Sequence, residues 1–372
     1  MLGVAGALWA CGDEPPPVDS VATTPQPLRA SAALKLEADA ANVQSGDLFG
    51  FSVAVTNQLA VVGARSDDAG IGAVYLFERE GDDGWSLAGP RLRPESATAG
   101  AAFGAAVSAL GDRVLVGAAG DSVRGAVYVV EPDVGSGAWR ARQKLLGEAN
   151  GDQFGAAVEL AGERAIVGAP LFDAGAAVNA GTAYIVERQA SGTWSLSARL
   201  AASVQAGAQL GRSVSLDGDL ALIGAPLDGA DNTGAAYVFR YEHAANTWAQ
   251  EAKLVVAEAA PNDELGWAVA LRGTTAVVTT RRADGGRGAA HVFQRQAPGQ
   301  WVRAQKLVAS DPDPLDQLGT SVALAGKRLL VGATGDQSAT GGGAAYLFEL
   351  RQEGGEPAAW WRSRSSSESR ST

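Results

Sequence analysis

The amino-acid sequence predicts an all-β protein built from one repeated unit. A glycine that opens a Gly-x-x-Val step recurs at positions 50, 104, 155, 211, 266 and 319. A tryptophan recurs in phase with it, at positions 85, 139, 194, 248, 301 and 360. Within each unit apolar and polar residues alternate, and helical periodicity is absent. Helix-free units of about 50 residues with four strands each are typical of β-propeller blades. We therefore expect a single β-propeller of six four-stranded blades.

The third unit shows the expected order of strands. Residues 154–162 (FGAAVELAG) alternate and end at the turn Gly162-Glu163, and residues 164–170 (RAIVGAP) form a mostly apolar strand. A loop leads to a third strand at 182–189 (TAYIVERQ), and the turn 190–192 leads to a fourth at 193–200 (TWSLSARL). A two-residue link such as Gly162-Glu163 suits a tight hairpin.

The stretch before the first unit predicts how the ring closes. It contains Lys35-Leu36, which matches the basic residue and leucine at the end of the fourth strand in later units. An N-terminal strand that completes the last blade would protect the edges of the sheet. Trp360-Trp361, at the other end, offers a competing fourth strand. A seventh blade would need about 50 more residues, so we expect six blades, or seven if the chain is truncated.

The two ends of the chain carry different signals. Cys11 follows Leu8-Trp9-Ala10 in a short apolar run, and this resembles a bacterial lipoprotein signal in which the cysteine is lipidated. An ordinary secretory leader or a disordered start is the alternative. Residues 12–30 then form a Pro-rich tether, residues 31–361 the propeller, and residues 362–372 a disordered Ser/Arg tail. We expect an exported lipoprotein in the outer membrane or periplasm or at the cell surface, held to the membrane only by this lipid.

The bulk composition excludes some partners. The 372 residues carry a formal net charge of −11, whereas a nucleic-acid-binding protein needs a basic face to displace counterions. One cysteine excludes an intrachain disulfide. With 48 glycines and only 6% aromatic residues, close packing must rely on small side chains.

The repeated motifs of the sequence resemble those of the FG-GAP repeat family. The Phe-Gly motif occurs unchanged at Phe49, Phe103 and Phe154, and the Gly-Ala-Pro motif occurs unchanged at 168–170 and 224–226. The resemblance covers residues 31–361 and implies a propeller like those of integrin α-chain heads and bacterial surface proteins. In calcium-binding integrin repeats a long Asp-rich loop joins the first two strands, but here that turn is tight. The resemblance therefore carries no calcium site onto this chain, no cofactor is firmly implied, and calcium elsewhere stays open.

Candidate binding residues lie in the loops between the second and third strands and at the starts of blades, which should share one face. Aspartates recur there and could bind cations or sugar hydroxyls, or could simply cap turns. The fuller loops, 170–182 and 226–234, break the repeat, as does Trp267 with its neighbouring arginines, which could form a recognition patch or only a solvated surface. The ligand-binding candidates are Asp173, Asn179, Asp228, Asp231, Asn232, Trp267, Arg281 and Arg282. Asp228 and Asp231 are weak metal candidates, because they lack the spacing of a D-x-D-x-D-G calcium loop.

Three functions fit these observations. The first is a surface-anchored binding module that recognises a protein or glycan, as in adhesion. The second is a structural scaffold of an envelope complex, which regular small-residue blades suit. The third is a carbohydrate-active enzyme, because two well-placed carboxylates suffice for glycoside hydrolysis. We find no catalytic motif, and the two histidines, His243 and His291, fall in different units.

Overall fold

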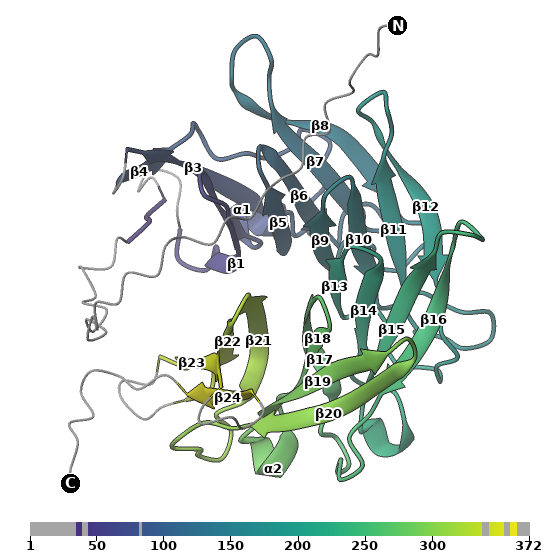
Figure 1. The fold of residues 1–372 in the computed structure, drawn as a ribbon. Helices are drawn as coiled ribbons and strands as arrows, with labels where there is room; N and C mark the ends of the chain where they lie inside the picture. Colours follow the sequence, from purple (N-terminus) through teal and green to yellow (C-terminus); the bar gives the residue numbers. More distant parts are fainter. Residues whose placement is uncertain (1–34, 39–43, 82–83, 337–341, 353–357, 363–372) are drawn as a thin grey trace, which may run out of the picture. The chain divides into compact units, whose positions relative to one another are not determined.

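The computed structural model describes residues 35–38, 44–81, 84–336, 342–352 and 358–362. These residues form six antiparallel four-stranded sheets arranged as the blades of a ring (Figure 1). In every sheet the strands lie in chain order, so each repeat forms one blade. The predicted all-β propeller of six four-stranded blades is confirmed. Cys11, the leader, the tether and all of the tail but Arg362 lie outside the described residues.

The strands of the first three blades are regular and short. The first blade contains β1 (Phe49–Val55), β2 (Leu59–Ala64), β3 (Ala73–Glu80) and β4 (Gly84–Leu87). The second contains β5 (Ala106–Leu110), β6 (Arg113–Ala118), β7 (Ala126–Pro132) and β8 (Trp139–Leu146). The third contains β9 (Ala157–Ala161), β10 (Arg164–Ala169), β11 (Thr182–Arg188) and β12 (Trp194–Leu200).

The last three blades follow the same plan. The fourth contains β13 (Ser213–Asp217), β14 (Leu220–Ala225), β15 (Ala235–Glu242) and β16 (Thr247–Leu254). The fifth contains β17 (Leu265–Arg272), β18 (Thr275–Thr280), β19 (Ala289–Ala297) and β20 (Gln300–Leu307). The sixth contains β21 (Leu318–Ala325), β22 (Arg328–Ala333), β23 (Ala344–Arg351) and β24 (Ala359–Arg362). Single helical turns occur only between second and third strands of the described chain, at α1 (Asp67–Gly70), η1 (Ala230–Asn232) and α2 (Ala283–Gly286).

Glycines allow the inner strands of neighbouring blades to touch. An added Cβ on Gly224 of the fourth blade would lie 2.1 Å from the carbonyl oxygen of Gly266 in the fifth. The Gly-Ala-Pro glycine of one blade thus abuts the Phe-Gly or Leu-Gly glycine of the next, where no side chain fits. The fifth blade has Thr279 in place of this glycine, and its hydroxyl donates to the Gly319 carbonyl at 2.7 Å. The repeated glycines are therefore packing residues.

Aromatic residues fill the space between blades. Phe103 packs edge-on against Tyr128, with ring centroids 5.2 Å apart, and is fully buried between the first and second blades. Farther out, the side chain of Gln143 in β8 donates to the carbonyl of Trp194 and accepts from its N–H, at 2.6 and 2.8 Å. The repeated tryptophan therefore joins a blade to the preceding one at its outer edge.

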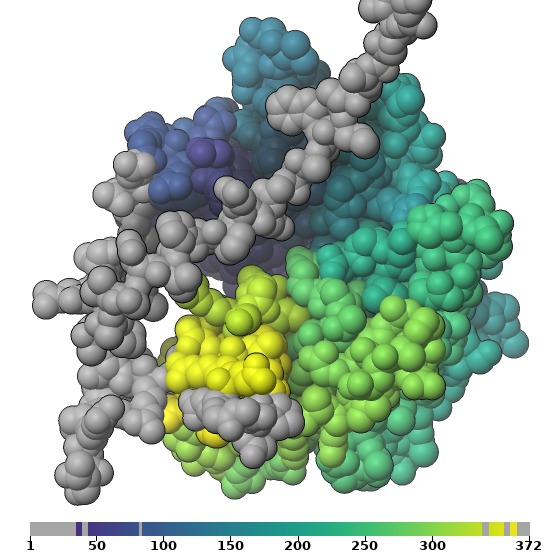
Figure 2. Space-filling view, viewed as in Figure 1, coloured from purple at the N-terminus to yellow at the C-terminus, as the bar shows by residue number. Residues whose placement is uncertain are grey.

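No such glycine contact joins the sixth blade to the first in the described part of the chain. Among the described residues nothing lies within 4 Å of a Cβ placed on Gly50, and a Cβ on Gly332 would meet only side chains of its own blade. Val53 and Leu330, on the facing surfaces, are 69% and 46% exposed. A gap between the yellow-green sixth blade and the purple first blade is visible in Figure 2. We call this place the seam.

The expected closing strand at the N-terminus differs from what the structure shows. Residues 35–38 carry no strand assignment, and Leu36 and Ala38 pack against the core of the first blade. The fourth strand of the sixth blade is β24, which contains Trp360 and pairs with β23. The competing tryptophan strand takes the place because Trp360 is buried against the fifth and sixth blades. Among the described residues no helix could cross a membrane.

Candidate functional site

All loops between second and third strands lie at one end of the blades, together with the links from one blade to the next. This follows because consecutive strands within every sheet are antiparallel. We call this end the loop face. It contains every ligand-binding candidate that the sequence predicts. The candidates nevertheless fall into residues that the repeat uses for its own stability and residues that depart from the repeat.

The aspartates at the starts of blades cap turns. The carboxylate of Asp263 accepts a hydrogen bond from the N–H of Ala260 at 2.8 Å, and that of Asp152 accepts from Ala149 at 3.0 Å. Asp47 and Asp316 make the same bond to the residue three positions earlier. All four are buried, so the turn-capping interpretation accounts for this recurring residue.

A second recurring aspartate forms a buried ionic unit inside the blade. Asp228 in the fourth blade accepts from the Tyr237 hydroxyl at 2.5 Å and forms an ion pair with Lys253 at 2.8 Å. Burial favours the neutral acid, but the hydrogen bonds from Lys253 and Tyr237 still hold the pKa of Asp228 below its ordinary value. Corresponding units are Asp67–Tyr75–Arg91 and Asp121–Tyr128–Lys144.

The two weak metal candidates, Asp228 and Asp231, differ in whether they belong to this buried unit. Asp228 is 3% exposed and is engaged by Tyr237 and Lys253, whereas Asp231 lies exposed in the loop that follows. The described residues contain no group of three or more His, Cys, Asp or Glu side chains that could hold a metal ion. The two aspartates thus lie in one loop but in different environments, one buried and one open to solvent.

The other candidates of the two fuller loops organise those loops. Asp173 is exposed and accepts from the N–H of Asn179 at 2.8 Å. The side-chain amide of Asn232 donates to the side chain of Asn262 at 3.2 Å, and so reaches the start of the fifth blade. Asp173 and Asn179 belong to the third blade, and Asp231 and Asn232 to the fourth. The structure therefore gives two separate polar loops.

Trp267 and Arg281 come together in the fifth blade. The guanidinium carbon of Arg281 lies 3.2 Å from the centroid of the Trp267 ring, and that of Arg212, from the fourth blade, lies 4.4 Å from it. Arg281 also pairs with Glu264 at 2.7 Å, and Arg282 pairs with the same carboxylate at 3.3 Å. The predicted patch is therefore a compact cation–π cluster. We call Arg212, Glu264, Trp267, Arg281 and Arg282 the arginine–tryptophan cluster.

Two residues that the sequence-based candidates did not include belong with this cluster. Arg212 occupies the position after Leu-Gly in its blade, where other blades have Phe51, Ala105, Ala156, Trp267 and Thr320. Arg65 follows Gly63-Ala64, at the repeat position that Arg281 holds after Thr279-Thr280, and its guanidinium carbon lies 3.9 Å from the Phe51 ring centroid. Aligning the six units column by column, and looking for charge in columns of small residues, is the signal that identifies both.

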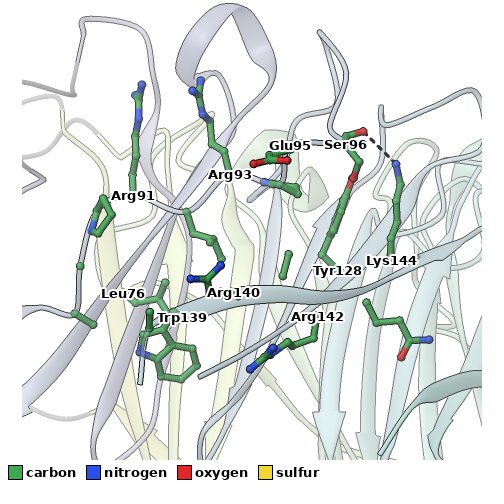
Figure 3. A pocket seen from close by; sticks show the side chains of 18 residues that line it. Leu76, Arg91, Arg93, Glu95, Ser96, Tyr128, Trp139, Arg140, Arg142 and Lys144 are labelled. Carbon is green, nitrogen blue, oxygen red and sulfur yellow. Dashed lines mark hydrogen bonds between the residues drawn. The ribbon is translucent and has the colours of Figure 1, made fainter. Parts of the chain in front are cut away.

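A hollow of about 690 Å³ lies between the outer parts of the first and second blades (Figure 3). Its basic lining consists of Arg91, Arg93, Arg140, Arg142 and Lys144. Four of these five pair with carboxylates, through Asp67, Asp68, Asp133 and Asp121. The hollow forms where β4 ends early, at Leu87, and Gly89-Pro90 follow it in place of further strand residues. Its charges are largely neutralised inside the protein.

The histidines do not form a catalytic arrangement with each other. His291 is 2% exposed and takes the place of the repeat tyrosine in β19. Burial, with the charges of Arg303 and Lys306, lowers the pKa of His291 to about 4. His243 lies exposed in the fourth blade, 2.7 Å from a carboxylate oxygen of Asp219. A packing role for His291 follows from its position.

Comparison with known families decides what these blades are. The sequence model of the FG-GAP repeat matches residues 35–77, 90–130, 139–186, 194–239, 248–293 and 301–348. The chain belongs to the FG-GAP repeat family. Each match covers the first two strands and most of the third strand of one blade, and the last four matches begin at the tryptophan in the fourth strand of the preceding blade. FG-GAP propellers are not typically catalytic. No curated protein matches the chain.

Proposed function

We propose that this FG-GAP protein is a binding module that recognises a protein or glycan through its loop face. The observation that carries the proposal is the arginine–tryptophan cluster. Residues that keep the repeat, such as Asp228 and Asp263, are buried and satisfied within their own blades. Trp267, Arg212 and Arg281 depart from the repeat and come from two neighbouring blades. Tryptophan and arginine are the residues most enriched at energetically dominant contact points.

Export and anchoring belong to the same proposal. The lipoprotein-like Cys11 and the Pro-rich tether would hold the propeller outside the cell, where a protein or glycan partner is met. In this arrangement the propeller binds by shape and charge and performs no reaction. The absence of a recognisable catalytic motif in the sequence fits this proposal.

The test is cross-linking of the tagged full-length protein on its native cells, followed by mass spectrometry of the captured molecules. We expect one dominant partner, and we expect its capture to fall at least tenfold in a Trp267→Ala, Arg281→Ala double variant. A matched control is Tyr241→Phe, Arg164→Gln, which alters another aromatic–arginine contact, one of 4.2 Å, outside the cluster. Equal capture by wild type and the cluster variant would remove the support for recognition at this site.

A scaffold of an envelope complex is the second candidate, and the seam favours it. Val53, Val55 and Leu330 are 69%, 71% and 46% exposed on the facing sides of the first and sixth blades. Apolar surface of this kind is a place for another protein to pack. Capture of neighbouring envelope proteins that is lost on Val53→Asp, and unchanged by the cluster variant, would favour the scaffold.

A further inference from the structure

Three arginines from three different blades lie around one end of the ring axis. Arg65 follows the Gly-Ala step at the end of β2, Arg281 holds the same repeat position after Thr279-Thr280 at the end of β18, and Arg212 precedes β13. The innermost strands surround the axis, and both repeat positions lie at their loop-face end (Figure 1). The other nine copies of these two repeat positions are uncharged: Phe51, Ala105, Ala119, Ala156, Pro170, Pro226, Trp267, Thr320 and Thr334. The positive charge there is a departure from the repeat, in a chain whose net charge is −11.

Aromatic rings position these guanidiniums without neutralising them. Arg281 and Arg212 lie 3.2 and 4.4 Å from the Trp267 ring centroid, and Arg65 lies 3.9 Å from that of Phe51. A ring attracts a cation through its quadrupole and leaves the N–H donors at the guanidinium edge able to bind another group. Phe51 is 47% exposed, so this side of the arrangement is open to solvent.

The carboxylates available inside the protein do not balance these charges. Glu264, whose side chain is 7% exposed, pairs with Arg281 and Arg282. Within the part of the chain that the structure describes, neither Arg65 nor Arg212 forms an ion pair with a carboxylate. Burial and the charge of Arg281 lower the pKa of Arg212, Glu264 opposes the shift, and Arg65 adds to it. The repulsion among the three cations is therefore only partly relieved.

We propose that this end of the axis binds the carboxylate side chains of an acidic peptide segment in a partner protein, a proposal that rests on the function proposed above. Guanidinium forks match the geometry of a carboxylate and bind it with paired hydrogen bonds. Glu264 already shows such a group between Arg281 and Arg282.

The test is isothermal titration of the full-length protein with an acetylated hexaglutamate peptide, and with hexaglutamine as the neutral probe. We expect saturable binding of hexaglutamate alone, weakened at least tenfold in Arg212→Gln and in Arg65→Gln. Affinity should also fall with added salt, because exposed charges are screened. The matched control is Arg124→Gln, Arg140→Gln, which removes two exposed arginines that lie outside the cluster and should leave binding unchanged.

Contradiction would take one of three forms. The first is no binding of hexaglutamate, and the second is binding that survives both single variants. The third is tighter binding of dextran sulfate with the same dependence on Arg65 and Arg212, which would assign a sulfated polysaccharide instead. A thermal melt of each variant excludes unfolding as the cause, and Arg65→Gln serves if Arg212→Gln does not fold. If the acidic peptide fails while capture on cells still depends on Trp267, the ligand class is wrong and the binding module stands.

Discussion

The guanidinium carbon of Arg281 lies 3.2 Å from the centroid of the Trp267 ring. Both residues stand at positions that other blades fill differently, and both belong to the blade whose Gly-Ala-Pro step reads Thr279-Thr280-Arg281. The fifth blade has therefore exchanged two repeat features for a cation–π pair. The fourth blade keeps the glycine contact, through Gly224 and the Gly266 carbonyl. The same repeat positions therefore hold packing residues in most blades and, in the fifth blade, the residues to which we assign binding.

The buried Asp–Tyr–Lys unit should contribute to stability. In Tyr237→Phe the carboxylate of Asp228 loses a hydrogen bond of 2.5 Å inside the blade. We expect the free energy of unfolding to fall by about 1.5 to 3 kcal/mol, as for other hydrogen bonds to buried charged groups. Tyr241→Phe is the control, because that hydroxyl bonds exposed Asn246, and its effect should stay within about 0.5 kcal/mol. Equal effects in urea denaturation would show that the unit has no special role.

The glycine contact between blades should be far less tolerant than its counterpart at the seam. In Gly224→Ala the new Cβ would lie 2.1 Å from the Gly266 carbonyl oxygen, so the fourth and fifth blades must separate. We expect a loss of about 1 to 3 kcal/mol in the free energy of unfolding, typical of an overpacked core.

Gly332→Ala is the matched variant at the seam. There the nearest atom is the Ser321 side-chain oxygen, at 2.4 Å, which a rotation about χ1 can move away. We expect a loss well below that of Gly224→Ala in the same denaturation experiment. If the two variants are destabilised equally, the sixth blade must have a close neighbour at that surface.

The protein should lose stability between pH 7 and pH 4 through His291. The pKa of His291 is lowered to about 4 in the folded protein, whereas an unfolded histidine titrates near 6.5. As the pH falls through this window the unfolded chain gains a proton that the folded protein does not bind. The effect approaches about 3 kcal/mol at pH 4 and is absent above pH 7.

His291→Tyr tests this origin directly, because it restores the residue of the other blades. The melting temperatures of wild type and variant should differ more at pH 5 than at pH 7, with the variant the more stable at pH 5. A constant difference across this range would mean that His291 does not titrate differently in the folded and unfolded states.

The blades could be predicted from sequence because each is specified six times. Period-two patterning, the Gly-x-x-Val step and the tryptophan recur together, so an error in one unit is corrected by the others. Closure occurs once and has no such redundancy. Both Leu36 and Trp360 carried fourth-strand signals, and burial of Trp360 against the fifth and sixth blades distinguishes them.

The site was only partly predictable, for a related reason. Trp267 and Arg281 were visible as departures from the repeat, whereas the aspartates at 228 and 263 drew attention by their charge. Their partners, Tyr237 with Lys253 and the N–H of Ala260, lie in other strands or in the backbone. Arg65 and Arg212 were missed because they come from the first and fourth blades. Only the ring brings the repeat positions they occupy together.

The most direct measurement of the central claim places a photo-activated cross-linker at two positions of the full-length protein on its native cells. One is Ala156, a repeat position at the loop-face end of the axis that carries no charge; the other is Val134, an exposed residue in a turn at the opposite end of the blades. The account predicts a discrete adduct from position 156 and none from position 134. An adduct from position 134 alone would contradict it and move the binding surface to the opposite face.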